Sequence, residues 1–208
     1  MIGGTSVDSE DVVPIDFLEL GEAINLLLSL PILIEDERQK PCVLSPYAPT
    51  DDSVGPSIVS ILTAILDRFS KKHGKQPIHY EPGCGDGRVS VEVAQNSSAY
   101  VVCLELDETL LRTGMKRRRH WLVDYVIGDL ATFKPRRVDT VYAYLLPSAV
   151  RTVLDVVEPS VLLSLDYPAT RNDPRECAEV KVAEYRTVYV YAVNKKQVSH
   201  TLRGSLLQ

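Results

Sequence analysis

The sequence contains no apolar stretch long enough to cross a membrane. Its longest apolar run, Ile24–Ile34, is interrupted by Asn25, Ser29 and Pro31, whereas a membrane-spanning helix needs about 20 consecutive apolar residues. We therefore expect neither a transmembrane helix nor a signal peptide. The sequence predicts a cytoplasmic protein without a membrane partner.

Cysteine is scarce, and no two cysteines have the spacing of a zinc knuckle or of a redox-active pair. The four are Cys42, Cys84, Cys103 and Cys177. Scattered cysteines are typical of a reduced intracellular protein. We therefore expect free thiols and no metal site, and we interpret Cys84 as a small side chain in a tight turn.

Positive charge is also in deficit. The chain has 23 Lys and Arg against 28 Asp and Glu, a formal net charge of −5. An acidic protein is a poor general binder of nucleic acid but is suited to basic partner proteins. Its 208 residues, 45% hydrophobic and 25% charged, suffice for one globular domain.

The first 40 residues are predicted to form an N-terminal extension, and residues 41–208 the main domain. Apolar positions between 15 and 30 recur with helical spacing, which predicts one amphipathic helix ending at Pro31. The polar residues 35–40 are typical of a connector.

The main domain alternates strand-like and helix-like segments. A helix that Asp52 or Ser53 can cap has one apolar face and ends at Gly74. Strands are expected at 78–81, 100–106, 125–127, 140–145 and 161–165, and helices at 89–95, 108–119 and 147–157. Two alternating runs, 179–184 and 187–193, predict an antiparallel hairpin joined around Tyr185-Arg186. The pattern predicts an α/β fold, a Rossmann-like and mostly parallel sheet with an antiparallel C-terminal hairpin and helices on both faces.

The segment Tyr80–Arg88, Y-E-P-G-C-G-D-G-R, is the most informative part of the sequence. Its alternate glycines let the backbone turn sharply and approach a ligand closely, and the following helix points free N–H groups at the loop. Glu105 comes 20 residues after Gly85, at the end of the next predicted strand. α/β sheets hold an adenosine in this way, because the acid at the strand end accepts from both ribose hydroxyls.

The spacing of the loop distinguishes between two cofactors. A dinucleotide site has the pattern G-x-G-x-x-G, with a pyrophosphate at the helix N-terminus. Here the pattern is G-x-G-x-G, and Asp86 would repel a pyrophosphate. Asp86 and Glu81 would instead suit the amine of S-adenosylmethionine (SAM), which leaves as S-adenosylhomocysteine after transfer.

Several segments resemble a known family, the small protein-lysine methyltransferases of archaea and their mitochondrial eukaryotic relatives. Residues 46–51, P-Y-A-P-T-D, and 81–88, E-P-G-C-G-D-G-R, are similar to the family signatures Y-x-P-T-[PD] and D-x-G-C-G-D-G-R. Residues 138–147, 163–167 and 187–191 resemble its fourth, fifth and last strands. The resemblance covers about residues 43–195. The chain departs from the pattern at Glu81, where Asp is usual, at Leu165, where many relatives have a polar residue, and in the first 40 residues.

This resemblance implies a class I SAM-dependent enzyme that methylates lysine side chains of proteins, for example chromatin proteins or other basic proteins. The residues implied in cofactor binding are Tyr47, Thr50, Glu81, Gly83, Gly85, Asp86, Arg88, Glu105, Asp129 and Leu130. Tyr144 and Asp166 lie at the ends of the fourth and fifth predicted strands, where open α/β sheets gather their ligands, and we interpret them as the catalytic residues of a lysine channel. The alternatives are an aromatic ring packed on a helix for Tyr144 and a surface acid at a strand end for Asp166.

Other interpretations remain open at this stage. The basic run Lys116–His120 suits a nucleic-acid phosphate, but cations at a helix C-terminus are usually solvated and matched to the helix dipole. We therefore expect a protein substrate with an exposed lysine, and not nucleic acid, to be the main target. A nucleic-acid or small-molecule methyltransferase and a non-catalytic SAM-binding module are the alternatives, and both a monomer and a dimer are compatible with the sequence.

Overall fold

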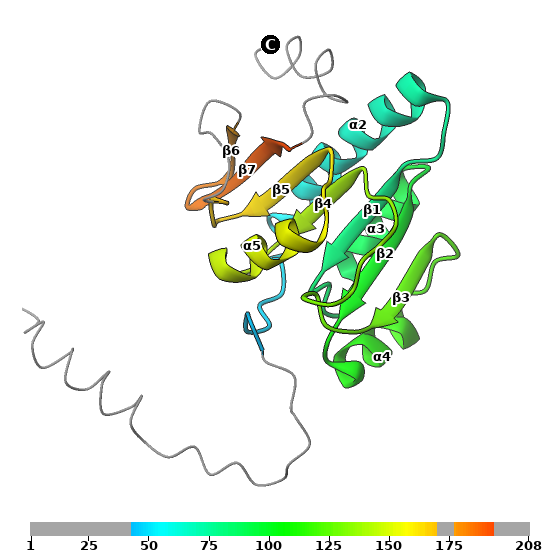
Figure 1. Cartoon of the computed structure of the whole chain (residues 1–208), viewed down its shortest axis with the longest axis vertical. Helices are drawn as coiled ribbons and strands as arrows, with labels where there is room; N and C mark the ends of the chain where they lie inside the picture. Colours follow the sequence, from blue (N-terminus) through cyan, green and yellow to red (C-terminus); the bar gives the residue numbers. More distant parts are fainter. Residues whose placement is uncertain (1–42, 170–176, 194–208) are drawn as a thin grey trace, which may run out of the picture. The chain divides into compact units, whose positions relative to one another are not determined.

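The computed structural model describes residues 43–169 and 177–193 (Figure 1). The predicted helix at 15–30, and with it the proposed extension of residues 1–40, lies outside this range. No helix in the described ranges is both long and apolar enough to span a membrane.

A mixed sheet forms the centre of the described part. Its strands are β1 (Ile78–Pro82), β2 (Tyr100–Glu105), β3 (Val123–Ile127), β4 (Thr140–Ala143), β5 (Val161–Leu165), β6 (Cys177–Ala183) and β7 (Arg186–Ala192). They lie in the order β3-β2-β1-β4-β5-β7-β6. Strands β1 to β5 pair in parallel, and β7 is antiparallel to both β5 and β6. The predicted mostly parallel sheet with an antiparallel terminal hairpin is therefore confirmed.

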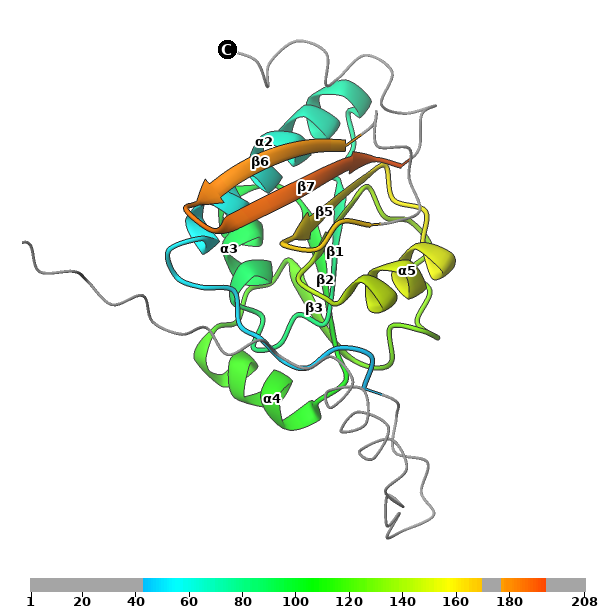
Figure 2. The same cartoon turned by 90° about the vertical axis from the view of Figure 1, so that its left-hand side faces the viewer.

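Helices cover both faces of this sheet, and each face has its own apolar core. The helices are α2 (Gly55–His73), α3 (Arg88–Asn96), α4 (Glu108–Arg117) and α5 (Pro147–Val156). Buried side chains of α2, α3 and α4 share one core, and those of α5 belong to the other. Figure 2 shows α3 and α4 on one side of the sheet and α5 on the other.

The ends of α2 show one correct prediction and one error. Gly74 ends the helix with φ 60°, a left-handed conformation that glycine adopts at little cost. The N-cap is Val54, without a side-chain cap, so the prediction that Asp52 or Ser53 caps the helix is wrong. The backbone carbonyl of Asp51 accepts from Val54 and Gly55 N–H instead, which satisfies two of the free donors of the first turn.

Several predicted boundaries differ from the structure: β3 begins at residue 123 and not 125, and β4 ends at 143 and not 145. Two further differences concern arginines. Helix α4 ends at Arg117 and not at residue 119, because Arg118 takes an extended conformation with φ −140°. The turn of the hairpin is Glu184-Tyr185, so Arg186 is already the first residue of β7. Arg118 therefore lies outside the helix and Arg186 inside the strand. Their side chains form ion pairs with acids that follow β1 and β5, Asp86 and Asp166.

The order of the strands indicates which edge of the sheet can bind a ligand. Strand β1 has β2 on one side and β4 on the other. The chain runs outward from β1 to β2 and β3 and then returns to the other side of β1 as β4, so the strand order reverses there. Open α/β sheets bind ligands at the carboxyl ends of the strands beside such a switch point. Glu81, Glu105, Tyr144 and Asp166 all lie at or just after strand ends there.

Candidate active site

The glycine loop between β1 and α3 needs glycine for both conformation and space. Gly83, Gly85 and Gly87 have φ of 71°, 61° and 72°, a region that residues with a Cβ rarely adopt. A Cβ on Gly85 would lie 2.4 Å from Cε2 of Tyr47. The Tyr47 ring therefore covers the loop, and the structure brings these two predicted cofactor residues together.

The segment that carries Tyr47 is held to the sheet at two further points. The Thr50 hydroxyl lies 2.9 Å from the Tyr142 hydroxyl, and the Leu146 N–H donates to Oγ of Ser45 at 3.2 Å. These bonds join residues about a hundred positions apart and hold the segment before α2 across the strand ends.

Backbone hydrogen bonds join the glycine loop to the end of β2. The N–H groups of Gly83 and Cys84 donate to the Leu104 carbonyl at 2.8 and 3.0 Å. The Gly85 N–H donates to Oε2 of Glu105 at 2.8 Å. Glu105 therefore orients the loop, in addition to lying at the strand end where a ribose is expected.

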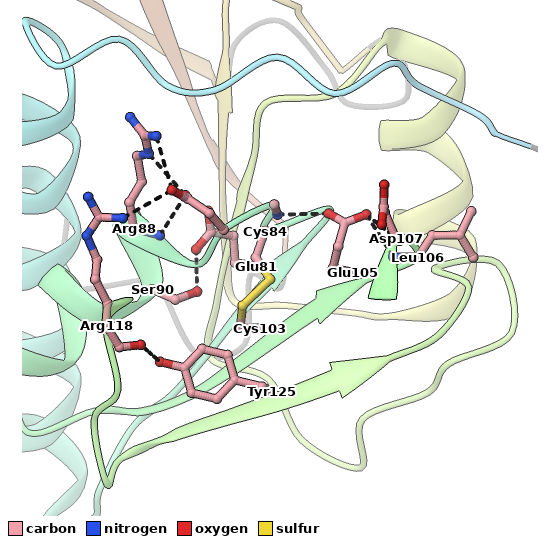
Figure 3. The surroundings of a disulfide bond; sticks show 12 residues. Glu81, Cys84, Arg88, Ser90, Cys103, Glu105, Leu106, Asp107, Arg118 and Tyr125 are labelled. Carbon is pink, nitrogen blue, oxygen red and sulfur yellow. Dashed lines mark hydrogen bonds and ion pairs between the residues drawn. A yellow bond between two sulfur atoms is a disulfide. The ribbon is translucent and has the colours of Figure 1, made fainter. Parts of the chain in front are cut away.

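A disulfide between Cys84 and Cys103 adds a covalent link at the same place (Figure 3). The expectation of free thiols is thus wrong for these two residues, while Cys177 is free. The two cysteines are 19 positions apart in the chain, so their spacing alone does not predict the disulfide. The parallel register decides the contact, because it places Glu81 of β1 opposite Cys103 of β2, and the loop turns back over that position.

The Glu105 carboxylate accepts three backbone hydrogen bonds. Oε1 accepts from the N–H groups of Leu106 and Asp107, and Oε2 from that of Gly85. A carboxylate offers about four acceptor positions, so one remains for a ligand hydroxyl. This geometry suits a hydrogen bond to one ribose hydroxyl, whereas the sequence predicts bonds to both hydroxyls.

Two arginines surround the Asp86 carboxylate. Arg88 donates to it through its backbone N–H, Nε and Nη2, and Arg118 donates through Nη1 at 3.1 Å. Burial raises the pKa of the Asp86 carboxyl, but the hydrogen bonds and charge of Arg88, aided by the charge of Arg118, outweigh burial and keep the pKa below its usual value. Asp86 is thus ionised and already paired, so its predicted contact with an amine would have to share the carboxylate with these guanidinium groups.

The pKa of Glu81 shifts in the opposite direction to that of Asp86. It is buried, and the Ser90 hydroxyl donates to its Oε2 (Figure 3). Burial, with smaller contributions from the charges of Asp86 and Glu105, raises the pKa of Glu81 to about 8. The carboxyl is therefore largely protonated at neutral pH, and a nearby cation would favour its ionisation.

Asp129 and Leu130 follow β3, as predicted. Oδ1 of Asp129 accepts from the Ala131 N–H at 2.8 Å, and Leu130 packs against the core on the α5 face. Asp129 thus lies in a tight turn at the same edge as Glu105, where the adenine amino group is expected.

A second cluster lies at the carboxyl ends of β4 and β5. The rings of Tyr144 and Tyr167 stack with their centroids 6.5 Å apart. The Arg186 guanidinium carbon lies 5.1 Å from the Tyr144 centroid, and Nε lies 2.8 Å from Oδ2 of Asp166. The Nε contact is an ion pair without hydrogen-bond geometry, and Nη2 of Arg186 is also buried without a hydrogen-bond partner in residues 43–169 and 177–193.

Asp166 itself has an unusual backbone. Its φ is 61°, the one positive value recorded for a described residue other than glycine. Its N–H donates to the Thr187 carbonyl at 2.8 Å, and its Oδ1 accepts from the Thr187 N–H at 3.3 Å. Such conformations persist where surrounding contacts impose them, often at functional sites.

Sequence reasoning missed the partners of the predicted residues. Arg118 with Asp86, Ser90 with Glu81, Tyr142 with Thr50, and Arg186 with Asp166 are all tertiary contacts. Ser90 is nine positions after Glu81 in the chain, on the far side of the glycine loop, and is the nearest of these partners in sequence. The remaining partners come from other elements and have no signal in the local sequence.

Comparison with known proteins agrees with this geometry. Residues 80–158 match a protein family described as a methyltransferase domain. The chain is similar to the RNA methyltransferase from Salinibacter ruber, crystallised with S-adenosylhomocysteine. The two are 25% identical with a TM-score of 0.59, over 71% of this chain and 95% of that one. No curated protein matches the chain.

Two other solved structures are more distant. Monomeric WbdD is 14% identical with a TM-score of 0.50, over 70% of this chain and 42% of that one. Magnesium protoporphyrin IX methyltransferase from Synechocystis PCC 6803, crystallised with SAM, is 14% identical with a TM-score of 0.46, over 70% and 85% of the chains.

The family match, the sheet order and the cofactor of the Salinibacter enzyme together define a class I SAM-dependent methyltransferase domain. The predicted fold and the predicted SAM cofactor are therefore confirmed.

Proposed function

We propose that the protein transfers methyl groups from SAM to lysine side chains of a partner protein. The observation that carries this proposal is the cationic guanidinium of Arg186, held against the Tyr144 ring and beside the Asp166 carboxylate. An aromatic face next to a carboxylate is the combination that attracts an alkylammonium group. The resemblance of residues 46–51 and 81–88 to lysine methyltransferases supports the same substrate.

The chain's own residues would prepare both reactants. Bound SAM supplies an electrophilic methyl group on a sulfonium. The glycine loop, Glu105 and Asp129 would hold the cofactor at the strand ends, and alignment of the two reactants is worth roughly 7–11 kcal/mol at most. Lysine has a solution pKa of about 10.4, so the site must also favour the neutral amine.

The cluster at the ends of β4 and β5 can favour the neutral amine. Asp166 would attract the protonated lysine, which would compete with Arg186 for the carboxylate. The positive charge of Arg186 and the apolar ring faces of Tyr144 and Tyr167 would then favour loss of the proton, because a like charge and desolvation both lower an amine pKa. Asp166 and Tyr144 thereby have distinct proposed roles, attraction and alignment.

RNA methylation is the second candidate. It is supported by the 25% identity to the Salinibacter ruber RNA methyltransferase over 95% of that chain. Enzymes that methylate DNA amino groups carry an N/D-P-P-Y/F element at the end of the fourth strand, where an aromatic ring stacks on the flipped base. Here residues 143–147 read A-Y-L-L-P, which lacks that element.

Radiolabelled SAM distinguishes the two candidates. The purified protein is incubated with a demethylated lysate, which is then divided between protease and nuclease. The lysine proposal expects label that protease removes, nuclease spares and acid hydrolysis recovers as methyl-lysine. Label removed by nuclease would overturn it in favour of RNA.

An Asp166→Asn variant sharpens this experiment. Asn tolerates the left-handed conformation of residue 166 but removes the charge that would attract an ammonium. We expect SAM binding to be kept and lysine methylation to fall. Equal labelling by the variant would remove Asp166 from the proposed mechanism.

A further inference from the structure

The end of α4 and the residues that follow it, 116–121, combine an exposed aromatic ring with positive charges. Trp121, the single tryptophan of the chain, is 81% exposed. The His120 ring lies beside it, with the centroids 5.9 Å apart. An indole so far out of the core contributes little to folding by burial, which leaves its position without a structural reason.

Exposed cations surround this ring. Lys116, Arg117 and Arg119 are exposed, and no acid among the described residues forms an ion pair with them. Arg118, between them, differs because it pairs with Asp86 in the glycine loop. Three unpaired charges within four residues form a local positive patch on a chain with a net charge of −5.

The dipole of α4 explains only part of this arrangement. Lys116 and Arg117 lie in the last helical turn, where cations stabilise a helix through its dipole. Arg119 and Trp121 lie beyond the helix, so they gain nothing of this kind. Cations that contact phosphates beside an exposed ring on which a base can stack are the features of single-strand binding.

We propose that residues 116–121, here called the basic-aromatic surface, bind single-stranded nucleic acid. Lys116, Arg117 and Arg119 would contact phosphates, and a base would stack on Trp121. This goes beyond the proposed lysine methylation and does not depend on it. Arg118 connects the surface to the cofactor loop through Asp86, and Gly114, one turn earlier, packs directly on the Asp86 carbonyl. A strand bound there would therefore lie next to the methyl-transfer machinery.

The single tryptophan makes binding directly measurable. Titrating the full chain with a single-stranded oligouridylate should quench the fluorescence of Trp121. Each phosphate neutralised on a single strand contributes about −0.7 to the slope of log affinity against log salt, so three cations predict a slope of about −2. The measurement needs no SAM and no methyl acceptor, so its result is independent of the lysine proposal.

Matched variants separate this surface from general electrostatics. The double variant Lys116→Glu/Arg117→Glu should lower the affinity at least tenfold. The double variant Lys71→Glu/Lys75→Glu makes the same charge change at exposed positions around the C-terminal end of α2 and should change it less than twofold. With a fluorescent oligonucleotide, Trp121→Ala should cost about tenfold, because base stacking on an aromatic ring is worth about 1–3 kcal/mol.

Three outcomes would overturn the proposal. The first is no binding to the oligonucleotide at low salt. The second is an equal loss in the two charge-reversed variants. The third is a blue shift of Trp121 with anionic phosphatidylserine vesicles but no response to oligonucleotide, which would assign the surface to a membrane instead.

Discussion

The cofactor side and the acceptor side of this sheet edge are built in different ways. On the cofactor side, backbone N–H groups, three left-handed glycines and a disulfide hold the loop between β1 and α3 against the end of β2. On the proposed acceptor side, residues just after β4 and β5 meet a β7 side chain through an ion pair and ring contacts, and Nη2 of Arg186 has no hydrogen-bond partner among the described residues. The cofactor side is thus held by backbone hydrogen bonds and a covalent link, whereas the proposed acceptor side is held by side-chain contacts.

Breaking the disulfide should have the largest effect on the cofactor side. In the chain-entropy model, a link that closes a loop of this length stabilises the fold by about 3 kcal/mol. The Cys84→Ala/Cys103→Ala variant should lose about that much in the free energy of unfolding, measured in denaturant without reductant. Cys177→Ala, which removes the free thiol of the described residues, should change it little. Equal stability of the wild type with and without reductant would contradict the link.

Removing the charge of Glu105 tests cofactor binding. Glu105→Gln keeps one carbonyl oxygen for the backbone but loses the charged acceptor for the ribose, so SAM binding should weaken by about 1.5–3 kcal/mol. Calorimetry measures this directly. Glu108→Gln, an exposed acid of α4 that pairs with Arg112, is the control and should bind SAM normally. Unchanged affinity in Glu105→Gln would remove the ribose assignment.

Gly114→Ala tests the contact between α4 and the glycine loop. Ala normally stabilises a helix interior relative to Gly by about 1 kcal/mol, but a Cβ here would lie 2.0 Å from the Asp86 backbone oxygen. We therefore expect the opposite sign, a loss of about 1–3 kcal/mol in the free energy of unfolding. Thr113→Ala, at the exposed neighbouring position, should change it by less than about 0.5 kcal/mol. A stabilised Gly114→Ala variant would show that the contact is not close.

The pKa of Glu81 predicts a proton effect on both stability and binding. The folded pKa of about 8 lies above the unfolded value of 4.5, so the unfolded state loses this proton first as the pH rises. The contribution of Glu81 should therefore make the fold progressively less stable from about pH 4.5 to pH 8, and constant above.

Binding of cationic SAM should lower this pKa and release a fraction of a proton near pH 7. Calorimetry in buffers of different ionisation enthalpy measures the release. In Glu81→Gln this contribution should disappear. The same release in that variant would assign it to another group.

The smallest effect on SAM affinity is expected from substitutions on the proposed acceptor side. Tyr144→Phe keeps the ring beside Arg186, so SAM affinity should stay within about twofold of wild type. Tyr144→Ala should also bind SAM normally but lose turnover, because the acceptor loses its wall. A loss of SAM affinity in either variant would erase the distinction between the two sides.

Local sequence was sufficient wherever one segment carries the whole signal. The alternation of strands and helices, the glycine loop and the position of Glu105 all depend on neighbouring residues and regular spacing, and the structure has them as predicted. The cap of α2 failed because the carbonyl of Asp51, and not a side chain, satisfies the first turn. The end of α4 failed because Arg118 leaves the helix to reach Asp86.

The fold class and the cofactor could be predicted from local sequence, because hydrophobic period and glycine spacing act over short stretches of chain. The charge state and the pairing of the site residues depend instead on tertiary packing. Parallel pairing of β1 and β2 brought Cys84 to Cys103, the packing of α4 brought Arg118 to Asp86, and the terminal hairpin brought Arg186 to Asp166. These partners are far apart in the chain, so their contacts depend on how whole elements pack and on the burial that packing imposes.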